Sequence, residues 1–532
     1  MALYLTLIGV IIITCVLLNN ASSKLGIPVL LAFLLLGIAL GSTNAMPFKI
    51  EDFELAEKIC SSALIFIMFY GGFGTNWNSA KGVALEAGLL ASVGVIMTAG
   101  LTGVFCHFAL KWGWLESFLM GSVISSTDAA SVFSILRSRK LGLKNNTVPL
   151  LEIESGSNDP FSYMLTAIML SLLNAGTSGG HIAWLVFSQI AFGAGFGVIF
   201  AWVAVWAMRR ISFATKGFDS LFIFAIAIIS YAIPCLIGGN GYLSAYIVGI
   251  IMGNNEFRGR KDQVHFFDGF TGLMQVLIFF LLGLLARPAL MNRVILPALA
   301  IFGIMILVAR PVSVALVLTP FRKYGFRQQT LISFVGLRGA ASIVFAIMAT
   351  VGNSVLQNDL LNIVFCIVLL SIALQGTLIP FVAGKLGMID ENMDVMTTFS
   401  DFAEETDIQF SQLEILADSP WCNKRIMDLG TPRTLRFCSL IHKDGAAEVP
   451  VGTSMLREGD TLIICSKTYS SRKELHIVQH EVRPNSKWIG HQLKEYPARR
   501  SQVLMIQRKS GNVIPSGSTV IQSGDILFIN ES

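Results

Sequence analysis

Long apolar runs fill the first three quarters of this 532-residue chain and constrain its fold more than any other feature. Up to about residue 390 the runs recur at roughly 20 residues, the length at which an α-helix crosses a hydrocarbon core of about 30 Å. The chain is 53% hydrophobic and 14% charged, whereas soluble proteins average about 25% charged residues. The sequence therefore predicts an all-α polytopic membrane domain over residues 1–390.

Thirteen apolar segments can be marked in this domain, each bounded by polar residues, glycine or proline. They cover approximately residues 3–18, 28–41, 60–76, 84–110, 116–137, 147–174, 181–208, 219–237, 241–253, 266–286, 294–319, 328–351 and 361–387. Basic residues cluster in alternate loops, around Arg139, Arg209, Arg260 and Lys323. Because positive charge accumulates in cytoplasmic loops, we expect about thirteen transmembrane helices in the inner membrane, with a periplasmic N-terminus and a cytoplasmic C-terminus.

A short internal repeat joins the fifth and twelfth segments. Asp128-Ala-Ala-Ser-Val in the fifth matches Gly339-Ala-Ala-Ser-Ile in the twelfth, 211 positions later. The alternation of loops gives these two segments opposite directions across the membrane, which is the arrangement of an inverted repeat. The glycine and small polar residues around both motifs tolerate broken helices, so we expect two broken helices that cross.

The charged region after residue 390 contains a second repeat, with a constant offset of 65 residues. Pro450-x-Gly452-x-x-x-Leu456-x-x-Gly459-Asp460 recurs as Pro515-x-Gly517-x-x-x-Ile521-x-x-Gly524-Asp525. In each copy the Gly-Asp pair predicts a turn before a β-strand. We expect a linker at 391–404 and two small α/β (α+β) cytoplasmic modules at 405–470 and 475–532.

The conspicuous ionisable residues inside predicted membrane segments are those that lie among small residues and helix breakers: Asp128, Glu154, Asp159 and Arg338. Each costs about 2.5–3.5 kcal/mol at mid-helix on insertion scales, so each needs a structural or functional reason. An arginine stays protonated and must have a partner if it is buried. Glu154 and Asp159 are five positions apart and point in different directions on a helix. We therefore expect Glu154 and Arg338 to form a structural ion pair.

This assignment leaves Asp159 and Asp128 as the carboxylates that handle an ion. The hydroxyl groups of Thr127 and Ser155 and the amide oxygen of Asn158 are suitable hard ligands for a monovalent cation. A buried carboxylate can bind a proton or a cation, but not both at once. This competition produces antiport when the site opens alternately to the two faces of the membrane.

The three motifs that hold these residues resemble those of cation/proton antiporters of the NhaP and sodium/proton exchanger type. They are Thr127-Asp128, Glu154-Ser-Gly-Ser-Asn-Asp159 and Gly336-Leu-Arg-Gly339. The resemblance covers residues 1–390 and implies a homodimer, with a dimerisation domain and a mobile core domain in each subunit. In that family the Asn-Asp pair accompanies electroneutral one-for-one exchange. The family's ion site would fall on Asp159, Asp128, Thr127, Ser155 and Asn158, and its core ion pair on Glu154–Arg338.

The chain departs from this family at one position of the third segment. Related sequences often carry an acidic residue before the Gly-Gly pair, and Tyr70 occupies that position in Phe69-Tyr70-Gly71-Gly72. The loss of a carboxylate near the ion path leaves open whether the cation selectivity and pH profile follow the commoner members.

The tail resembles tandem C-terminal lobes of RCK regulatory domains, also called TrkA-C domains. The resemblance implies dimerisation in the cytoplasm and regulation by pH or by a small molecule, with a nucleotide as one example. Such tails accompany potassium-handling proteins, which favours K⁺ as the cation exchanged for H⁺.

Two alternative functions and several exclusions accompany this interpretation. A Na⁺(Li⁺)/H⁺ antiporter would use the same carboxylates, because nothing in the motifs selects cation size. The tail alone is also compatible with a channel-like potassium uptake component, but the expected carbonyl-rich filter loop is absent from the sequence. The residues contain no nucleophile–base–orienter set and no metal cluster, so neither an enzyme nor a cofactor is expected. No basic stripe with interleaved aromatic residues indicates nucleic-acid binding, and lipid is the expected surrounding partner.

Overall fold

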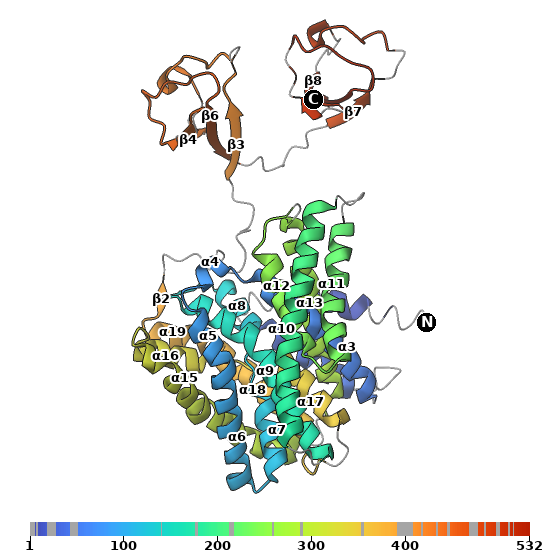
Figure 1. The fold of residues 1–532 in the computed structure, drawn as a ribbon, viewed down its shortest axis with the longest axis vertical. Helices are drawn as coiled ribbons and strands as arrows, with labels where there is room; N and C mark the ends of the chain where they lie inside the picture. Colours follow the sequence, from blue (N-terminus) through green and yellow to red (C-terminus); the bar gives the residue numbers. More distant parts are fainter. Residues whose placement is uncertain are drawn as a thin grey trace. The chain divides into compact units, whose positions relative to one another are not determined.

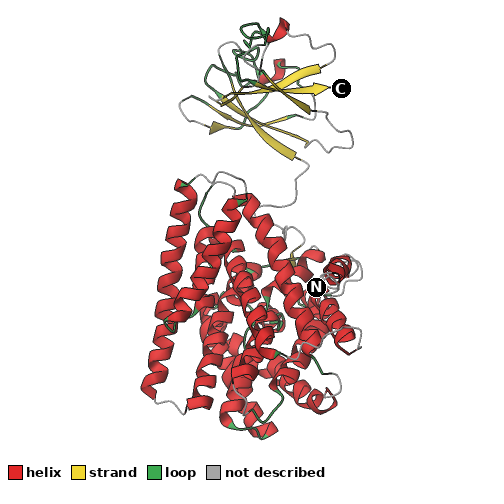
Figure 2. Ribbon diagram, turned by 90° about the vertical axis from the view of Figure 1, so that its right-hand side faces the viewer, coloured by secondary structure: helices red, strands yellow, loops and turns green. Residues whose placement is uncertain are grey.

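The computed structural model contains two compact units, residues 1–403 and 404–532. In the first unit it describes residue 6 and residues 9–18, 28–42, 52–139, 141–175, 179–211, 217–257, 260–287, 291–352 and 356–390. In the second unit it describes residues 408–416, 419–431, 435–443, 447–467, 477–482, 486–495, 501–508, 511–513, 515 and 517–531. Figure 2 shows the helical character of the first unit and the strands of the second.

The first unit is a bundle of helices joined by short loops (Figure 1). Its α-helices are α2 Val29–Ser42, α3 Phe53–Gly74, α4 Trp77–Ala80, α5 Ala84–Leu89, α6 Val95–Leu110, α7 Trp114–Val123, α8 Ala129–Ser138, α9 Thr147–Ala175, α10 Gly179–Arg210, α11 Phe218–Leu236, α12 Gly241–Gly253, α13 Arg260–Leu285, α14 Met291–Ile304, α15 Arg310–Leu318, α16 Phe326–Phe334, α17 Ala340–Gly352, α18 Leu360–Leu370 and α19 Thr377–Lys385. Three π-helical turns continue helices without a loop: Leu90–Gly94, Met305–Ala309 and Ser371–Gly376. Side-chain caps start several helices; for example, Asp52 accepts a hydrogen bond from Leu55 N at 3.0 Å at the start of α3.

Six helical stretches of the described residues are long and apolar enough to cross a membrane by length and composition. They are Ala84–Leu110, Gly179–Arg210, Phe218–Leu236, Asp262–Leu285, Met291–Phe321 and Leu360–Lys385. Each of the thirteen expected segments overlaps at least one described helix, but several of these helices are short, broken or interrupted by charged residues. The helical, multi-pass membrane architecture is therefore confirmed, and the exact number of crossings stays a prediction.

The expected break occurs in both repeat-bearing segments. Between α7 and α8 the helix is interrupted at Ile124–Asp128, and between α16 and α17 it is interrupted at Val335–Gly339. A run of serine, threonine and aspartate in the first break and two glycines in the second weaken helical hydrogen bonding at these points. The two motifs found 211 positions apart thus occupy equivalent places, each at the start of the second half-helix.

A short strand pair lies at the end of the helical unit. Strand β1 (Gly142–Leu143) follows α8, and strand β2 (Ile389–Asp390) follows α19. They are antiparallel, with Gly142 opposite Asp390 and Leu143 opposite Ile389. The segment that follows α19 is therefore hydrogen-bonded to the connection between α8 and α9.

The second unit contains two antiparallel four-stranded sheets with the same topology. The first has strand order β3-β6-β4-β5, with β3 Ile408–Glu414, β4 Arg436–Ile441, β5 Ala447–Glu448 and β6 Thr461–Lys467. The second has strand order β7-β10-β8-β9, with β7 Ile477–Glu481, β8 Ser501–Arg508, β9 Gly511–Val513 and β10 Ile526–Glu531. The helical part of each module is limited to a 3₁₀-helix among the described residues, Ile426–Asp428 in the first and Leu493–Glu495 in the second.

The Gly-Asp turns explain why the tail repeat is recognisable in the sequence. Gly459 and Gly524 both have positive φ angles, +85° and +83°, which favour glycine. The buried carboxylate of Asp460 accepts a hydrogen bond from Arg457 N at 2.8 Å, and that of Asp525 accepts one from Gln522 N at 2.9 Å. Both modules therefore use the same turn to enter their last strand.

Candidate functional site

The two helix breaks touch one another through their backbones. Asp128 N donates a hydrogen bond to Leu337 O at 2.8 Å, and the hydroxyl groups of Ser126 and Ser342 are 3.3 Å apart. Four half-helix ends meet here, with α8 and α17 contributing positive N-termini and α7 and α16 contributing negative C-termini. Such ends can stabilise charged side chains and bound ions inside a membrane.

Gly339 is required where the two breaks cross. A Cβ atom at this position would lie 2.0 Å from Asp128 Oδ2 and 2.5 Å from Asp128 Cγ. We expect Gly339→Ala to displace Asp128 and to lower the free energy of unfolding by about 1–3 kcal/mol. Thermal unfolding of the purified protein measures this change. Gly352→Ala at the end of α17 is the matched control, since its Cβ would make ordinary contacts of 3.5 Å or more; an equal loss in both variants would contradict the steric argument.

One face of α9 carries the predicted ligands and packs against the first break. The Ser155 hydroxyl donates to the backbone carbonyl of Thr127, and Asn158 Nδ2 donates to Thr127 Oγ1 at 2.6 Å. All three residues are buried. The hydrogen bonds hold the carbonyl and hydroxyl of Thr127 close to α9, so the structure brings these three predicted site residues together.

Asp159 is a buried carboxylate close to the crossing. Its side chain is only 7% exposed, and the Ser126 hydroxyl lies beside it, with Asp128 and Arg338 as its charged neighbours. Among the atoms of the described residues, Asp159 Oδ1 and the adjacent Asn158 Oδ1 are buried without a hydrogen-bond partner. Buried polar atoms normally have partners, so these two oxygens are available to a ligand.

Asp128 differs from Asp159 in both exposure and hydrogen bonding. It is half-buried, and its carboxylate accepts hydrogen bonds from Ser131 N at 3.2 Å and from Ser131 Oγ at 2.5 Å. Asp128 therefore caps the N-terminus of α8, where a negative charge is favourable. Its position next to Asp159 is as expected, and the cap gives it a structural role that the sequence motif did not reveal.

The predicted ion pair between Glu154 and Arg338 is wrong, because Glu154 pairs with a different arginine. Glu154 Oε1 instead forms a salt bridge with the guanidinium of Arg310, the first residue of α15. Both side chains are almost completely buried, at 1% and 2% exposure. Arg310 supplies the positive charge because its long side chain reaches Glu154 of α9. The sequence motifs did not single it out, although Ala309-Arg310-Pro311 interrupts an apolar run with a charge and a proline.

Arg338 donates its hydrogen bonds to the backbone of the first helix break. Its Nη1 donates to the carbonyl oxygens of Ser125, at 2.9 Å, and Ser126, and its Nε lies 3.1 Å from the sulfur of Met305. These carbonyls have lost their helical partners because α7 ends at Val123. Arg338 therefore satisfies the unwound backbone and compensates the negative C-terminal end of α7.

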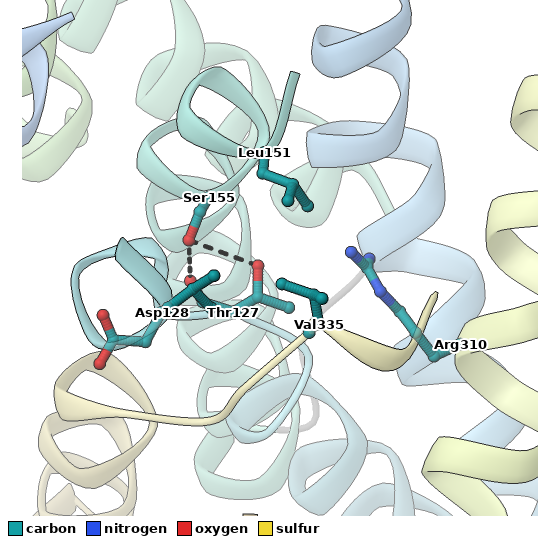
Figure 3. Close-up of a pocket in the computed structure, with 8 residues that line it drawn as sticks. Thr127, Asp128, Leu151, Ser155, Arg310 and Val335 are labelled. Atoms are coloured by element: carbon teal, nitrogen blue, oxygen red, sulfur yellow. Dashed lines mark hydrogen bonds between the residues drawn. The ribbon is translucent and has the colours of Figure 1, made fainter. Parts of the chain in front are cut away.

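A small cavity of about 10 Å³ lies between the crossing and Arg310. It is lined by Thr127, Asp128, Val132, Leu151, Ser155, Arg310, Val335 and Gly336. Figure 3 shows the Thr127–Ser155 contacts on one wall and the Arg310 guanidinium across from them, with the Asp128 carboxylate turned away from Arg310. The cavity thus lies between the hydroxyl groups of Thr127 and Ser155 on one side and the buried Arg310 on the other.

The unusual Tyr70 of α3 also has a defined partner. Its hydroxyl donates to Asp268 Oδ1 of α13 at 2.9 Å. A carboxylate is therefore present beside this position, supplied by a different helix. Spacing alone could not reveal it, since the two residues are 198 positions apart.

Comparisons with known proteins agree with this fold and with these motifs. The family described as sodium/hydrogen exchanger, transmembrane, matches residues 9–385, and the TrkA-C domain matches residues 477–529. The K(+)/H(+) antiporter NhaP2 of Shewanella oneidensis is 32% identical over 461 residues, covering 86% of this chain and 79% of the relative. The K(+)/H(+) antiporter NhaP of Alkalimonas amylolytica is 32% identical over 471 residues, covering 87% and 81%.

A solved structure of similar fold comes from an archaeal protein. The sodium proton antiporter MjNhaP1 from Methanocaldococcus jannaschii at pH 8 superposes with a TM-score of 0.62 at 21% identity, covering 71% of this chain and 99% of that chain. This similarity supports the fold of the membrane unit. With the family match and the relatives above, it leads to one assignment: the chain belongs to the sodium/hydrogen exchanger family of transmembrane transporters and carries a TrkA-C domain near its C-terminus.

Proposed function

We propose that this protein exchanges a monovalent cation, K⁺ in preference to Na⁺, for H⁺ by competition at Asp159. The observation that supports this most directly is the pair of buried oxygens, Asp159 Oδ1 and Asn158 Oδ1, that lack hydrogen-bond partners among the described residues. A carboxylate and an amide oxygen side by side suit a hard cation without its full water shell. Thr127, Ser155 and Asp128 complete the proposed ion site.

Charge balance explains why the two substrates compete. A buried carboxylate is costly unless it is neutralised. Either a proton or a monovalent cation neutralises Asp159, and each carries one positive charge. If the site reorients only when it is neutral, one cation crosses for each proton and the exchange is electroneutral. Arg310 and Arg338 take no part in this competition, because each is held by a fixed partner.

Potassium is the proposed cation because of two comparisons. The relatives with 32% identity are named K(+)/H(+) antiporters, and the TrkA-C domain occurs in the same chain. Sodium or lithium is the second candidate. It is favoured by the probable Na(+)/H(+) antiporter 2 of Methanocaldococcus jannaschii, which is 29% identical over 347 residues and covers 62% of this chain and 80% of that relative.

The wider assembly belongs to the same proposal. We infer a homodimer in the inner membrane, surrounded by lipid, with the N-terminus in the periplasm and the two tail modules in the cytoplasm. The tail would bind a small regulatory molecule and adjust the rate of exchange. The basic loops around Arg139, Arg209, Arg260 and Lys323 support this orientation.

Exchange by the purified full-length protein in lipid vesicles tests the proposal. A proton gradient is imposed across the vesicle membrane, and K⁺, Na⁺, Li⁺ or NH₄⁺ is added while the internal pH is followed with a dye. Potassium is expected to dissipate the gradient fastest, without a dependence on membrane potential. Equal inactivity with all four cations would refute antiport, and a clear preference for Na⁺ or Li⁺ would establish the second candidate.

A further inference from the structure

Two tyrosines of α12, Tyr242 and Tyr246, face the helix that carries Asp159. They are four residues apart, so they lie on one face of α12, separated by about 6 Å along its axis. Both are buried, at 2% and 3% exposure. Neither belongs to the proposed ion site, and neither was singled out by the sequence motifs.

Tyr246 fills the space beside Gly156. A Cβ atom at residue 156 would lie 2.6 Å from Tyr246 Cε2 and 2.8 Å from Tyr246 Oη. The missing side chain therefore lets the phenol ring lie directly against α9. Ser157 Oγ donates to Tyr246 Oη at 3.3 Å, which anchors the polar end of the ring while its apolar body covers the helix.

Tyr242 forms an aromatic cluster further along α9. Its ring centroid is 5.0 Å from that of Tyr163 on α9 and 6.3 Å from that of Phe345 on α17, and the Tyr163 and Phe345 centroids are 5.9 Å apart. Three helices thus meet in a packed aromatic layer. A cavity of about 270 Å³ reaches Tyr163, with Trp184, His181 and Gln189 among its other lining residues.

These two contacts bracket Asp159 along its own helix. Gly156 precedes Asp159 by three residues and Tyr163 follows it by four, so both lie within one turn of the carboxylate and on the same face of α9. The helix that carries the tyrosines is firmly packed against α3, because a Cβ at Gly249 of α12 would lie 2.1 Å from Phe69 O. Asp159 therefore lies between two aromatic contacts that a separate, tightly packed helix pair supplies.

We propose that Tyr246 and Tyr242 are the two barriers of alternating access. Tyr246 closes the route to Asp159 on the side where α9 begins, and Tyr242, with Tyr163 and Phe345, closes it on the side where α9 ends. The inference rests on the antiport proposed above, because only an alternating site needs a barrier on each side. A phenol ring excludes a hydrated cation by its apolar body, and a small shift of α9 relative to α12 would open one contact at a time.

Uncoupled proton leak distinguishes a barrier from a packing contact. Full-length Tyr246→Ala and Tyr242→Ala are reconstituted in vesicles of one lipid composition, and decay of a pH gradient is measured without an exchangeable cation and then with K⁺. Loss of one barrier is expected to raise the cation-independent decay about tenfold over wild type. Tyr246→Phe is expected to stay as tight as wild type, since the ring is retained.

Tyr231→Ala is the matched control. Tyr231 packs behind Tyr242 from α11, with centroids 4.8 Å apart, so its loss should lower thermal stability without raising the leak. If Tyr246→Ala does not fold, Gly156→Ala replaces it, because the added methyl group would push the Tyr246 ring away from α9. Its expected result is the same rise in leak.

The outcomes separate this inference from the proposed function. A wild-type protein that exchanges cations for protons, with alanine variants or Gly156→Ala that stay tightly coupled, overturns the barrier assignment and leaves the antiport intact. A leak in Tyr231→Ala equal to that in Tyr242→Ala would show that general loosening is the cause. A wild-type protein that exchanges none of the four cations refutes the antiport itself.

Discussion

Asp159→Asn is expected to abolish cation/proton exchange while leaving the protein folded. The substitution keeps the shape of the side chain and removes the group that alternately binds a proton and a cation. A positioned proton-transfer group contributes about 10²–10⁴-fold to the rate of the step it serves, so the exchange rate should fall by at least about 100-fold. The initial rate of K⁺-dependent pH change in vesicles measures this loss.

The same variant should unfold at a temperature equal to or above that of wild type. A buried carboxylate with an unpartnered oxygen is a destabilising element, and an amide of the same size removes its charge. Glu116→Gln is a suitable control, because Glu116 is also buried but accepts a hydrogen bond from Asn358 N at 2.8 Å, away from the crossing. Exchange that persists in Asp159→Asn would refute the proposed carrier site.

The second large effect concerns the buried ion pair between Glu154 and Arg310. Glu154→Gln is expected to lower the free energy of unfolding by about 3–5 kcal/mol, because it leaves the Arg310 charge buried without a counter-charge. Thermal unfolding of the purified protein, with transport measured in parallel, records the change. The double variant Glu154→Gln/Arg310→Gln should recover most of the stability, since it removes both buried charges together.

An ion pair near the surface gives the comparison. Glu86 and Lys323 are 2.5 Å apart, with side chains that are 7% and 46% exposed. The lysine left behind in Glu86→Gln therefore stays in contact with solvent, and this substitution should cost less stability than Glu154→Gln. Unchanged stability in Glu154→Gln would contradict the structural role of the pair. Arg338→Gln should also be destabilising, but Glu154→Gln should not rescue it, because Arg338 donates to backbone carbonyls and not to Glu154.

The residues of the proposed ion site could be picked out from the sequence because they violate local rules. Asp159 places a carboxylate in an apolar run and is followed by a proline, so the hydropathy pattern alone marks it as unusual. The break in each crossing helix was predictable for a similar reason, since Ser-Ser-Thr-Asp128 and the two glycines of Gly-Leu-Arg-Gly339 are poor helix formers. The tail repeat can be recognised in the sequence because Gly459 and Gly524 both need positive φ angles, which few other residues adopt.

The partners of these residues were not predictable in the same way. Glu154 could pair with Arg338 or with Arg310 as far as charge is concerned, and the sequence motif drew attention to Arg338 alone. The structure decides between them through the backbone. The broken end of α7 leaves carbonyls that need donors, Arg338 supplies them, and Arg310 on α15 is the guanidinium that reaches Glu154.

The sequence by itself therefore determined the helical membrane architecture, the two helix breaks and the repeat in the tail, and it marked Asp159 as the centre of the proposed ion site. Hydropathy, charge and helix breaking are properties of short stretches of chain, so they can be read locally. Only the tertiary structure decided which charges neutralise one another, which carboxylate accompanies Tyr70, and which aromatic rings pack against the helix that carries Asp159. Those contacts join residues far apart in the chain, such as Tyr246 and Gly156, and their distances depend on how whole helices pack.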